Sequence, residues 1–224
     1  MHFILSWIPV FFRATLVMLI HNWIPTYASL CWQGREHSPF CPWCHTGIET
    51  VEHVIQCNNH MATEHQWSLM QGFLQTMLNA GTPIHMIVCW EYKLSLVLNL
   101  PWICTYQIAS QLIKDHQLLL IKAVQNQNII WWDLLLHGFC STLWLQFYNL
   151  FPNNFPNCRW DVLLVSSITT LLKGIWDNRN KIIHGATRME ASKQIRERMQ
   201  QWTRAIYLHP QESIKVIKRS RPYL

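Results

Sequence analysis

A tight group of cysteine and histidine residues near the start of the chain is the feature that most constrains its fold. Residues 41–57 read CPWCHTGIETVEHVIQC, so Cys41 and Cys44 bracket two residues, and His53 and Cys57 follow four positions apart. A Cys-x-x-Cys turn directs two thiolates at one metal ion, and residues four apart on a helix share one face. Three thiolates and one imidazole match a closed tetrahedral zinc site. The sequence therefore predicts a structural Zn²⁺ ion held by Cys41, Cys44, His53 and Cys57.

The residues around these ligands favour the turns that such a site requires. Thr50 is the expected N-cap of a short helix that carries His53 and Cys57. Glu52 lies in the first turn of that helix, where a carboxylate interacts favourably with the helix dipole. Gly47 permits the turn between the two halves of the site. The expected module is thus a cysteine knuckle followed by a helix.

Other interpretations of the cluster are open from the sequence. The cysteines could be ordinary buried residues or form a disulfide, and His45 or His60 could replace His53 as a ligand. His45 directly follows Cys44, so its side chain would have to point elsewhere, and His60 lies about a turn beyond Cys57; His53 is preferred. The eight cysteines of the chain are irregularly spaced, which favours a metal site in a reducing compartment, nuclear or cytoplasmic.

Apolar residues at helical intervals predict a mainly α fold for the rest of the chain. Half of the residues are apolar, and no Asn-Gly or Asp-Gly hairpin or sustained period-two alternation predicts strands. We expect a small Cys₃His zinc knuckle-helix module followed by a helical bundle. The expected domains are an N-terminal helix plus zinc-binding module at 1–62, a helical region at 63–150, and a helical tail with a basic C-terminal arm at 151–224.

Several helices are predicted within these domains. The first is expected to bury Trp67, Met70, Phe73, Leu74 and Met77 and to stop before Gly81 and Pro83. Residues 84–99 and 105–124 offer two more apolar segments, and a further helix is expected near 160–178. Within 127–148, a buried helix face is the favoured interpretation of an apolar series formed by Trp131, Leu135, Leu136, Phe139 and Leu143.

An apolar run close to the N-terminus has two interpretations. Residues 3–20 read FILSWIPVFFRATLVMLI, which is near the lower length limit for a membrane span. Arg13 lies in the middle of the run, where its charge would cost about 2.5–3.5 kcal/mol in a bilayer, and Pro9 interrupts the helix further. A buried core helix is therefore favoured over a membrane or signal segment.

The net charge of +6 is distributed unevenly. Eleven Lys or Arg and three Glu lie from residue 179 to residue 224, whereas the rest of the chain has seven basic and nine acidic residues. Such a basic arm favours contact with nucleic-acid phosphates or another anionic surface, because neutralised phosphates release counterions; a solvated helix face is the alternative. The candidate nucleic-acid-binding residues are Arg179, Lys193, Arg196, Arg204, Lys215, Lys218, Arg219 and Arg221.

Arg179 belongs to a polar string at 176–185, WDNRNKIIHG. Its guanidinium could bridge carbonyls or a carboxylate, Asn180 could cap a helix, and Gly185 suits a left-handed turn. A buried polar clamp that holds the last two helices together is favoured over direct nucleic-acid contact by Arg179 or His184.

The stretch from 21 to 57, HNWIPTYASLCWQGREHSPFCPWCHTGIETVEHVIQC, resembles the zinc-binding region downstream of the reverse transcriptase domain in non-LTR (LINE-type) retrotransposons. That family shows a W-[IL]-P-T step, a variable run, C-P-x-C, an E-T dipeptide and a closing His and Cys. His45 stands where the family often has Gly, and the interval between the closing His and Cys is shorter than in many relatives. The matching residues are Trp23-Ile24-Pro25-Thr26, Cys41-Pro42-Trp43-Cys44, Glu49-Thr50, His53 and Cys57.

The resemblance is looser over 127–207 and hardly present over 58–126. A W-x-x-R-N-x-x-x-H-G string, here at 176–185, also occurs in these retrotransposon C-termini, as does a segment with Gln, Trp and Gly like 127–148. The resemblance implies the C-terminal part of a reverse transcriptase polyprotein, in which zinc fixes the fold and basic residues hold template RNA or target DNA during target-primed reverse transcription.

Motifs for catalysis are missing from the sequence. It has no [FY]-x-D-D, no pair of carboxylates spaced for two-metal chemistry, no Gly-rich phosphate loop, no G-x-S-x-G and no H-E-x-x-H. We therefore expect a non-catalytic zinc-binding and nucleic-acid-binding protein. The alternatives are a structural or protein-interaction helical domain, and a protein anchored in a membrane through residues 3–20.

Overall fold

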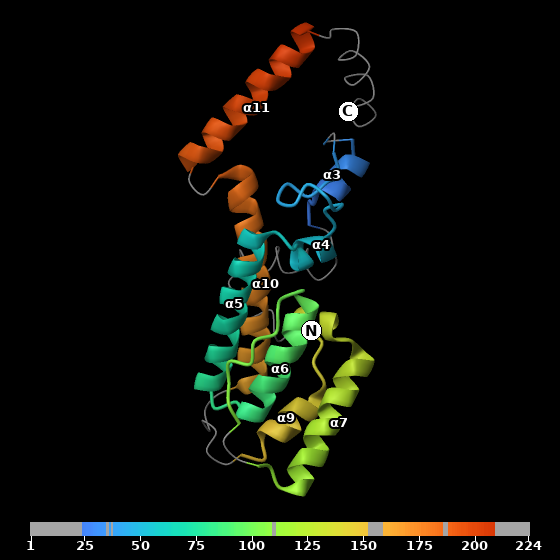
Figure 1. Ribbon diagram of the computed structural model, residues 1–224, viewed down its shortest axis with the longest axis vertical. Coiled ribbons are helices and arrows are strands. Elements are labelled where there is room, and N and C mark those ends of the chain that lie inside the picture. Colours follow the sequence, from blue (N-terminus) through green and yellow to red (C-terminus); the bar gives the residue numbers. More distant parts are fainter. Residues whose placement is uncertain are drawn as a thin grey trace. The chain divides into compact units, whose positions relative to one another are not determined.

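The computed structural model describes residues 24–34, 36, 38–108, 111–151, 159–185 and 188–208 (Figure 1). Over these ranges the sole β pairing is an isolated antiparallel bridge between Phe40 and Ile48. The predicted mainly α fold is therefore confirmed. Its helices are α3 (Tyr27–Trp32), α4 (Val51–Gln56), α5 (His60–Asn79), α6 (Ile84–Val97), α7 (Lys114–Ile130), α8 (Trp132–Leu136), α9 (Thr142–Tyr148), α10 (Trp160–His184) and α11 (Arg188–Leu208).

The described residues form two compact units. The larger unit contains residues 55–175, and the smaller unit combines residues 24–54 with those from 176 onward. The boundaries fall inside α4 and inside α10. The three consecutive domains expected from the sequence have other boundaries, and they stay a prediction.

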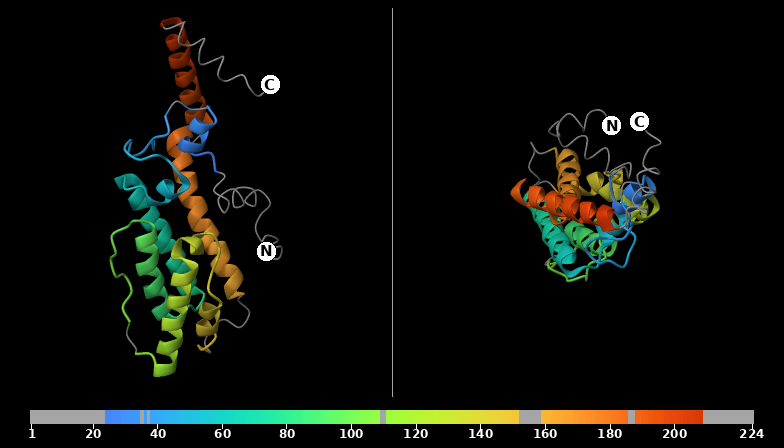
Figure 2. Two further views of the ribbon diagram at one scale, coloured as in Figure 1. Left: turned by 90° about the vertical axis from the view of Figure 1, so that its right-hand side faces the viewer. Right: turned by 90° about the horizontal axis from the view of Figure 1, so that it is seen from above.

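The larger unit is a bundle in which α5 packs against α6, and α7 packs against α9 (Figures 1 and 2). Its core is rich in aromatic rings around Trp90, which is fully buried. The Trp90 ring lies 5.9 Å from Phe73, 5.7 Å from Trp144 and 5.8 Å from Trp160. Each aromatic pair contributes about 0.5–1.5 kcal/mol beyond the burial of its area.

The helix hairpin of α5 and α6 follows the sequence pattern. The side chain of Asn59 caps α5 through a 3.0 Å bond from the Met61 amide. The helix ends at Asn79, and Gly81 adopts a positive φ of 79° that lets the chain turn into Pro83, just before α6. Of the predicted core residues, Met70, Phe73, Leu74 and Met77 are buried and Trp67 is half-buried.

The helix expected over 105–124 begins later in the structure. Residues 101–108 are irregular, and α7 starts only at Lys114. The buried carboxylate of Glu91 accepts bonds from the Thr105 amide at 3.2 and 3.3 Å, and Trp102 packs edge-on against Tyr92 at 5.3 Å. These contacts with α6 hold the connecting segment in a non-helical conformation. They outweigh the apolar composition that favoured a helix there.

The buried helix face expected within 127–148 is replaced by two short helices around the amide of Gln127. This fully buried side chain donates to the carbonyls of Trp131 and Phe139, both at 3.2 Å, and accepts from the Ser141 amide at 2.9 Å and the Trp144 indole at 3.3 Å. Four partners satisfy the amide completely. Leu135 and Leu136 are buried as expected, but Trp131 and Phe139 are exposed, because the chain leaves the helical path to reach Gln127.

The polar string at 176–185 continues α10 rather than ending it. The helix runs from Trp160 to His184, and Gly185 then takes a positive φ of 86°, as the sequence predicts. Asn180 lies inside the helix, where its Oδ1 accepts a 3.0 Å bond from Arg179 Nη1, so its expected capping role is wrong.

The N-terminal apolar run at 3–20 lies outside the described residues. Among the helices of the described ranges, none combines the length and apolarity that a membrane crossing requires.

Candidate metal centre

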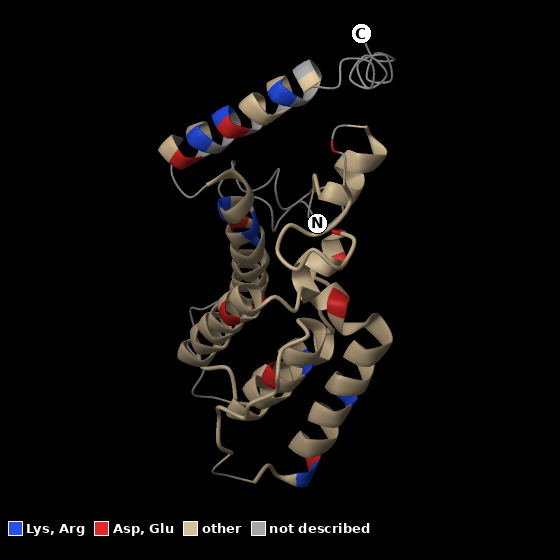
Figure 3. Ribbon diagram, turned by 45° about the horizontal axis from the view of Figure 1, so that its top comes forward, with Lys and Arg blue, Asp and Glu red and all other residues tan. Residues whose placement is uncertain are grey.

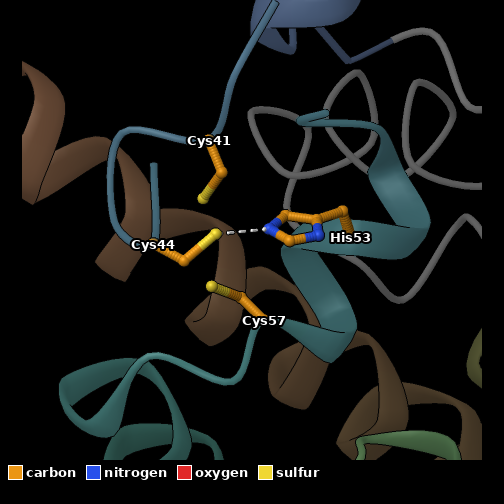
Figure 4. A group of neighbouring side chains, drawn as sticks. All are labelled: Cys41, Cys44, His53 and Cys57. Carbon is orange, nitrogen blue, oxygen red and sulfur yellow. Dashed lines mark hydrogen bonds between the residues drawn. The ribbon is translucent and has the colours of Figure 1, made fainter. Parts of the chain in front are cut away.

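Four side chains converge near the N-terminal end of the described chain (Figure 4). The sulfurs of Cys41, Cys44 and Cys57 and a ring nitrogen of His53 all lie within 4.8 Å of one another. Cys41 and Cys44 come from the knuckle, His53 from α4, and Cys57 directly follows that helix. These are the four ligands predicted from the sequence, and together they can hold one metal ion.

A tight loop brings the first two cysteines together. The amide of Cys41 donates to the Gly47 carbonyl at 2.7 Å, and the amide of His45 donates to the Cys41 carbonyl at 2.9 Å. His45 takes a positive φ of 57°, which closes the loop, and the bridge from Phe40 to Ile48 holds its two ends. The Trp43 amide also donates to Cys41 Sγ at 3.4 Å. A thiolate at Cys41 is stabilised by such a donor.

The second half of the site is positioned by α4. Thr50 caps this helix as predicted, because its Oγ1 accepts a 3.1 Å bond from the His53 amide. Glu52 lies in the first turn, where its charge is favourable. The four-residue spacing then places His53 and Cys57 on the same side, facing the knuckle (Figure 4).

Burial and ionisation differ among the ligands. Cys41 and Cys57 are 2% and 0% exposed, whereas Cys44 and His53 are half-buried. Burial alone would raise the pKa of the Cys44 thiol, but hydrogen bonds from Thr46, from the Gly47 amide and from His53 lower this pKa to about 6. His53 Nε2 lies 3.3 Å from Cys44 Sγ. A thiolate at Cys44 is thus available for metal coordination at neutral pH.

The alternative histidine ligands and a disulfide do not fit the structure. His45 is exposed, and Nε2 of His60 faces Glu64 Oε1 at 3.4 Å, so neither histidine belongs to the group. No cysteine within the described ranges forms a disulfide, and this includes Cys41, Cys44 and Cys57.

A buried ion pair lies in the same unit as the knuckle. Arg179 donates from Nε to Glu49 Oε1 at 3.0 Å and from Nη2 to Glu49 Oε2 at 2.5 Å. The side chains are 3% and 0% exposed. Arg179 is therefore buried against Glu49 and not available to a phosphate, so its assignment as a nucleic-acid-binding residue is wrong. The expected buried clamp exists, but it joins the C-terminal part of α10 to the knuckle and not the last two helices to each other.

Glu49 is the residue whose role the sequence did not reveal. The Glu49-Thr50 dipeptide stood out as part of a motif, yet nothing near it indicated a partner 130 residues away. The scarcity of acidic residues, twelve in 224, was the available signal, because an acid within a cysteine cluster that is not a ligand needs another partner.

The remaining basic candidates divide between described and undescribed residues. Lys193, Arg196 and Arg204 are exposed on α11, along which Lys and Arg recur in Figure 3. Lys193 Nζ lies 4.0 Å from Glu197 Oε1, a surface pair of little energetic weight. The other four candidates, Lys215, Lys218, Arg219 and Arg221, lie outside the described residues.

Comparison with protein-family models, with curated proteins and with solved structures finds no match for this chain. The resemblance to retrotransposon zinc-binding regions therefore rests on the residues of the sequence motif.

Proposed function

We propose that this chain is a zinc-binding domain whose metal is structural. The observation that carries the proposal is the convergence of three sulfurs and one imidazole nitrogen within 4.8 Å. Thiolate and imidazole ligands in this number favour Zn²⁺ in a tetrahedral site over hard cations such as Mg²⁺ or Ca²⁺. Four protein ligands leave no position for water, so the metal stabilises the fold and the chain is non-catalytic.

Elemental analysis of purified protein tests the metal assignment. We expect one zinc per chain. The variant in which Cys41 and Cys44 are both replaced by Ser should contain no zinc and should not bind added zinc. Protein that is fully folded and free of metal would contradict the proposal.

We further propose that the chain binds RNA or DNA through basic residues in its C-terminal part. Lys193, Arg196 and Arg204 are exposed, and their spacing places them within about 80° of the α11 circumference. Three cations on one face can each neutralise a phosphate. The resemblance to LINE-type reverse transcriptases supports a role in holding template RNA or target DNA.

The salt dependence of binding tests the nucleic-acid proposal. Replacing Lys193, Arg196 and Arg204 with Ala should lower the slope of log affinity against log salt by roughly 0.7–0.9 for each lost phosphate contact. A second variant removes Lys215, Lys218, Arg219 and Arg221. Replacing the exposed Lys114 and Lys122 of α7 is the matched control. If the slope of log affinity against log salt were the same in every variant as in the wild type, the C-terminal residues would be removed from the proposal.

A protein-interaction domain is the second candidate function, favoured by an exposed apolar face on α7. Leu118, Ile121 and Ile129 share this face at helical spacing and are 51%, 52% and 75% exposed. The exposed Lys122 and Gln125 lie among them, so the face is mixed, with apolar side chains available to a partner. An affinity for nucleic acid that does not change with salt concentration would favour a protein-interaction domain over a nucleic-acid-binding one.

A further inference from the structure

The position of Glu49 depends on the metal-binding loop. Its amide donates to the Pro39 carbonyl at 2.8 Å, and the preceding residue, Ile48, pairs with Phe40. These two contacts tie the ends of the loop that carries Cys41 and Cys44. The closed loop therefore fixes the backbone position of Glu49.

Arg179 also contacts two aromatic rings, one on its own helix α10 and one on α3. Its guanidinium carbon lies 4.8 Å from the centre of the Trp176 ring and 5.3 Å from that of Tyr27. The carboxylate of Glu49 also accepts a 2.6 Å bond from the Tyr27 amide. The ion pair thus joins three segments, namely the end of the knuckle, the start of α3 and the C-terminal part of α10.

Both charges of this pair are buried away from water. The contact is therefore expected in two states, one with the ion pair formed and one with both charged groups exposed to water. Opening of the loop would displace Glu49 and leave Arg179 buried without its partner, a costly arrangement. The last turns of α10 would then have to detach so that the guanidinium reaches water. A partly displaced pair is disfavoured, so closure of the loop and anchoring of α10 occur together.

We propose that Glu49 and Arg179 are positioning residues of the metal centre, which couple metal binding at the four ligands to the anchoring of residues 176–184. The inference rests on the proposed metal-binding function. Metal binding closes the loop, the closed loop places Glu49, and Glu49 holds Arg179. By thermodynamic reciprocity, loss of the ion pair weakens metal binding by the same factor by which metal strengthens the anchoring.

Zinc affinity measured by competition with a chromophoric chelator tests one side of the coupling. Arg179→Lys keeps the charge but loses the bidentate geometry, and Glu49→Gln keeps the shape but loses the charge. We expect each to weaken zinc binding at least about fivefold, the lower end of typical coupling. The control is Arg159→Lys, which alters an exposed pair with Asp161 at 2.9 Å and should leave the affinity within about twofold of the wild type.

Amide hydrogen exchange tests the other side. In the wild type, zinc should slow exchange over 176–184 by a factor similar to the loss of affinity in the variants. In Glu49→Gln, zinc at saturating concentration should no longer slow exchange there. A residue that only stabilises the fold would weaken protection equally with and without metal, leaving the zinc-dependent factor unchanged.

The outcomes separate this inference from the proposed function. Wild-type protein that binds no zinc would overturn both. Zinc binding with unchanged affinity in Arg179→Lys, or with no zinc-dependent protection of 176–184 in the wild type, would overturn the coupling alone. If the variants fail to fold, the exchange measurement on the wild type decides.

Discussion

Gly47 lies directly against the imidazole of His53, close enough that a Cβ at position 47 would come within 2.7 Å of Nδ1. The knuckle and α4 approach each other at this point. Glycine at 47 is therefore required for steric reasons, whereas the positive φ that closes the loop is at His45. The ring of His53 can reach Cys44 only because no side chain fills this space.

Gly47→Ala should displace His53 and weaken zinc binding by roughly tenfold or more, since about 1.4 kcal/mol of strain corresponds to a factor of ten. Chelator competition measures the change. Gly72→Ala is the matched control, because nothing lies within 4 Å of a Cβ there and alanine in a helix stabilises by about 0.5–1 kcal/mol. A Gly47→Ala protein with wild-type affinity would show that the ring has room to move.

Removal of the metal should reduce helix content cooperatively, because folding of a small metal site and metal binding are one process. Cys57→Ser should reproduce the effect of a chelator in far-ultraviolet circular dichroism. Cys89→Ser should not, since Cys89 lies on α6 outside the ligand group. Equal damage from both substitutions would mean that the cysteines act only as core residues.

Alkylation should distinguish the cysteines by their pKa. In the metal-free protein at pH 7, iodoacetamide should modify Cys44 readily, because its pKa of about 6 makes it mostly thiolate. Burial raises the pKa of Cys140 to about 12, so this thiol should stay unmodified. Mass spectrometry across a pH series should place the midpoint for Cys44 near pH 6, with the rate falling as the thiolate is protonated. Zinc should protect Cys44, and modification that ignores zinc would contradict its role as a ligand.

Gln127→Met should destabilise the larger unit by roughly 2–5 kcal/mol, because several buried partners would lose their hydrogen bonds at about 1–3 kcal/mol each. Urea unfolding followed by tryptophan fluorescence measures the loss. Gln125→Met, at an exposed position of the same helix, should change stability by less than about 0.5 kcal/mol. Similar results for the two variants would show that the Gln127 network has little energetic weight.

The sequence by itself determined the mainly helical fold, the α5–α6 hairpin and the group of four side chains that could hold a metal ion. Each of these depends on residues close together in the chain. His53 and Cys57 come to the same side because they are four residues apart, with Cys57 directly after the end of α4. Helix α5 ends where Gly81 and Pro83 disfavour its continuation. Local geometry is sufficient for such features.

Only the tertiary structure decided the roles of Glu49, Arg179 and Gln127. The string around Arg179 favoured a clamp but did not name its partner, and only the fold showed that this partner is a buried carboxylate 130 residues away. Gln127 likewise broke an apolar segment that a helix would otherwise have continued. A buried polar group must find its hydrogen-bonding partners wherever the fold supplies them, and those partners are not encoded by spacing along the chain.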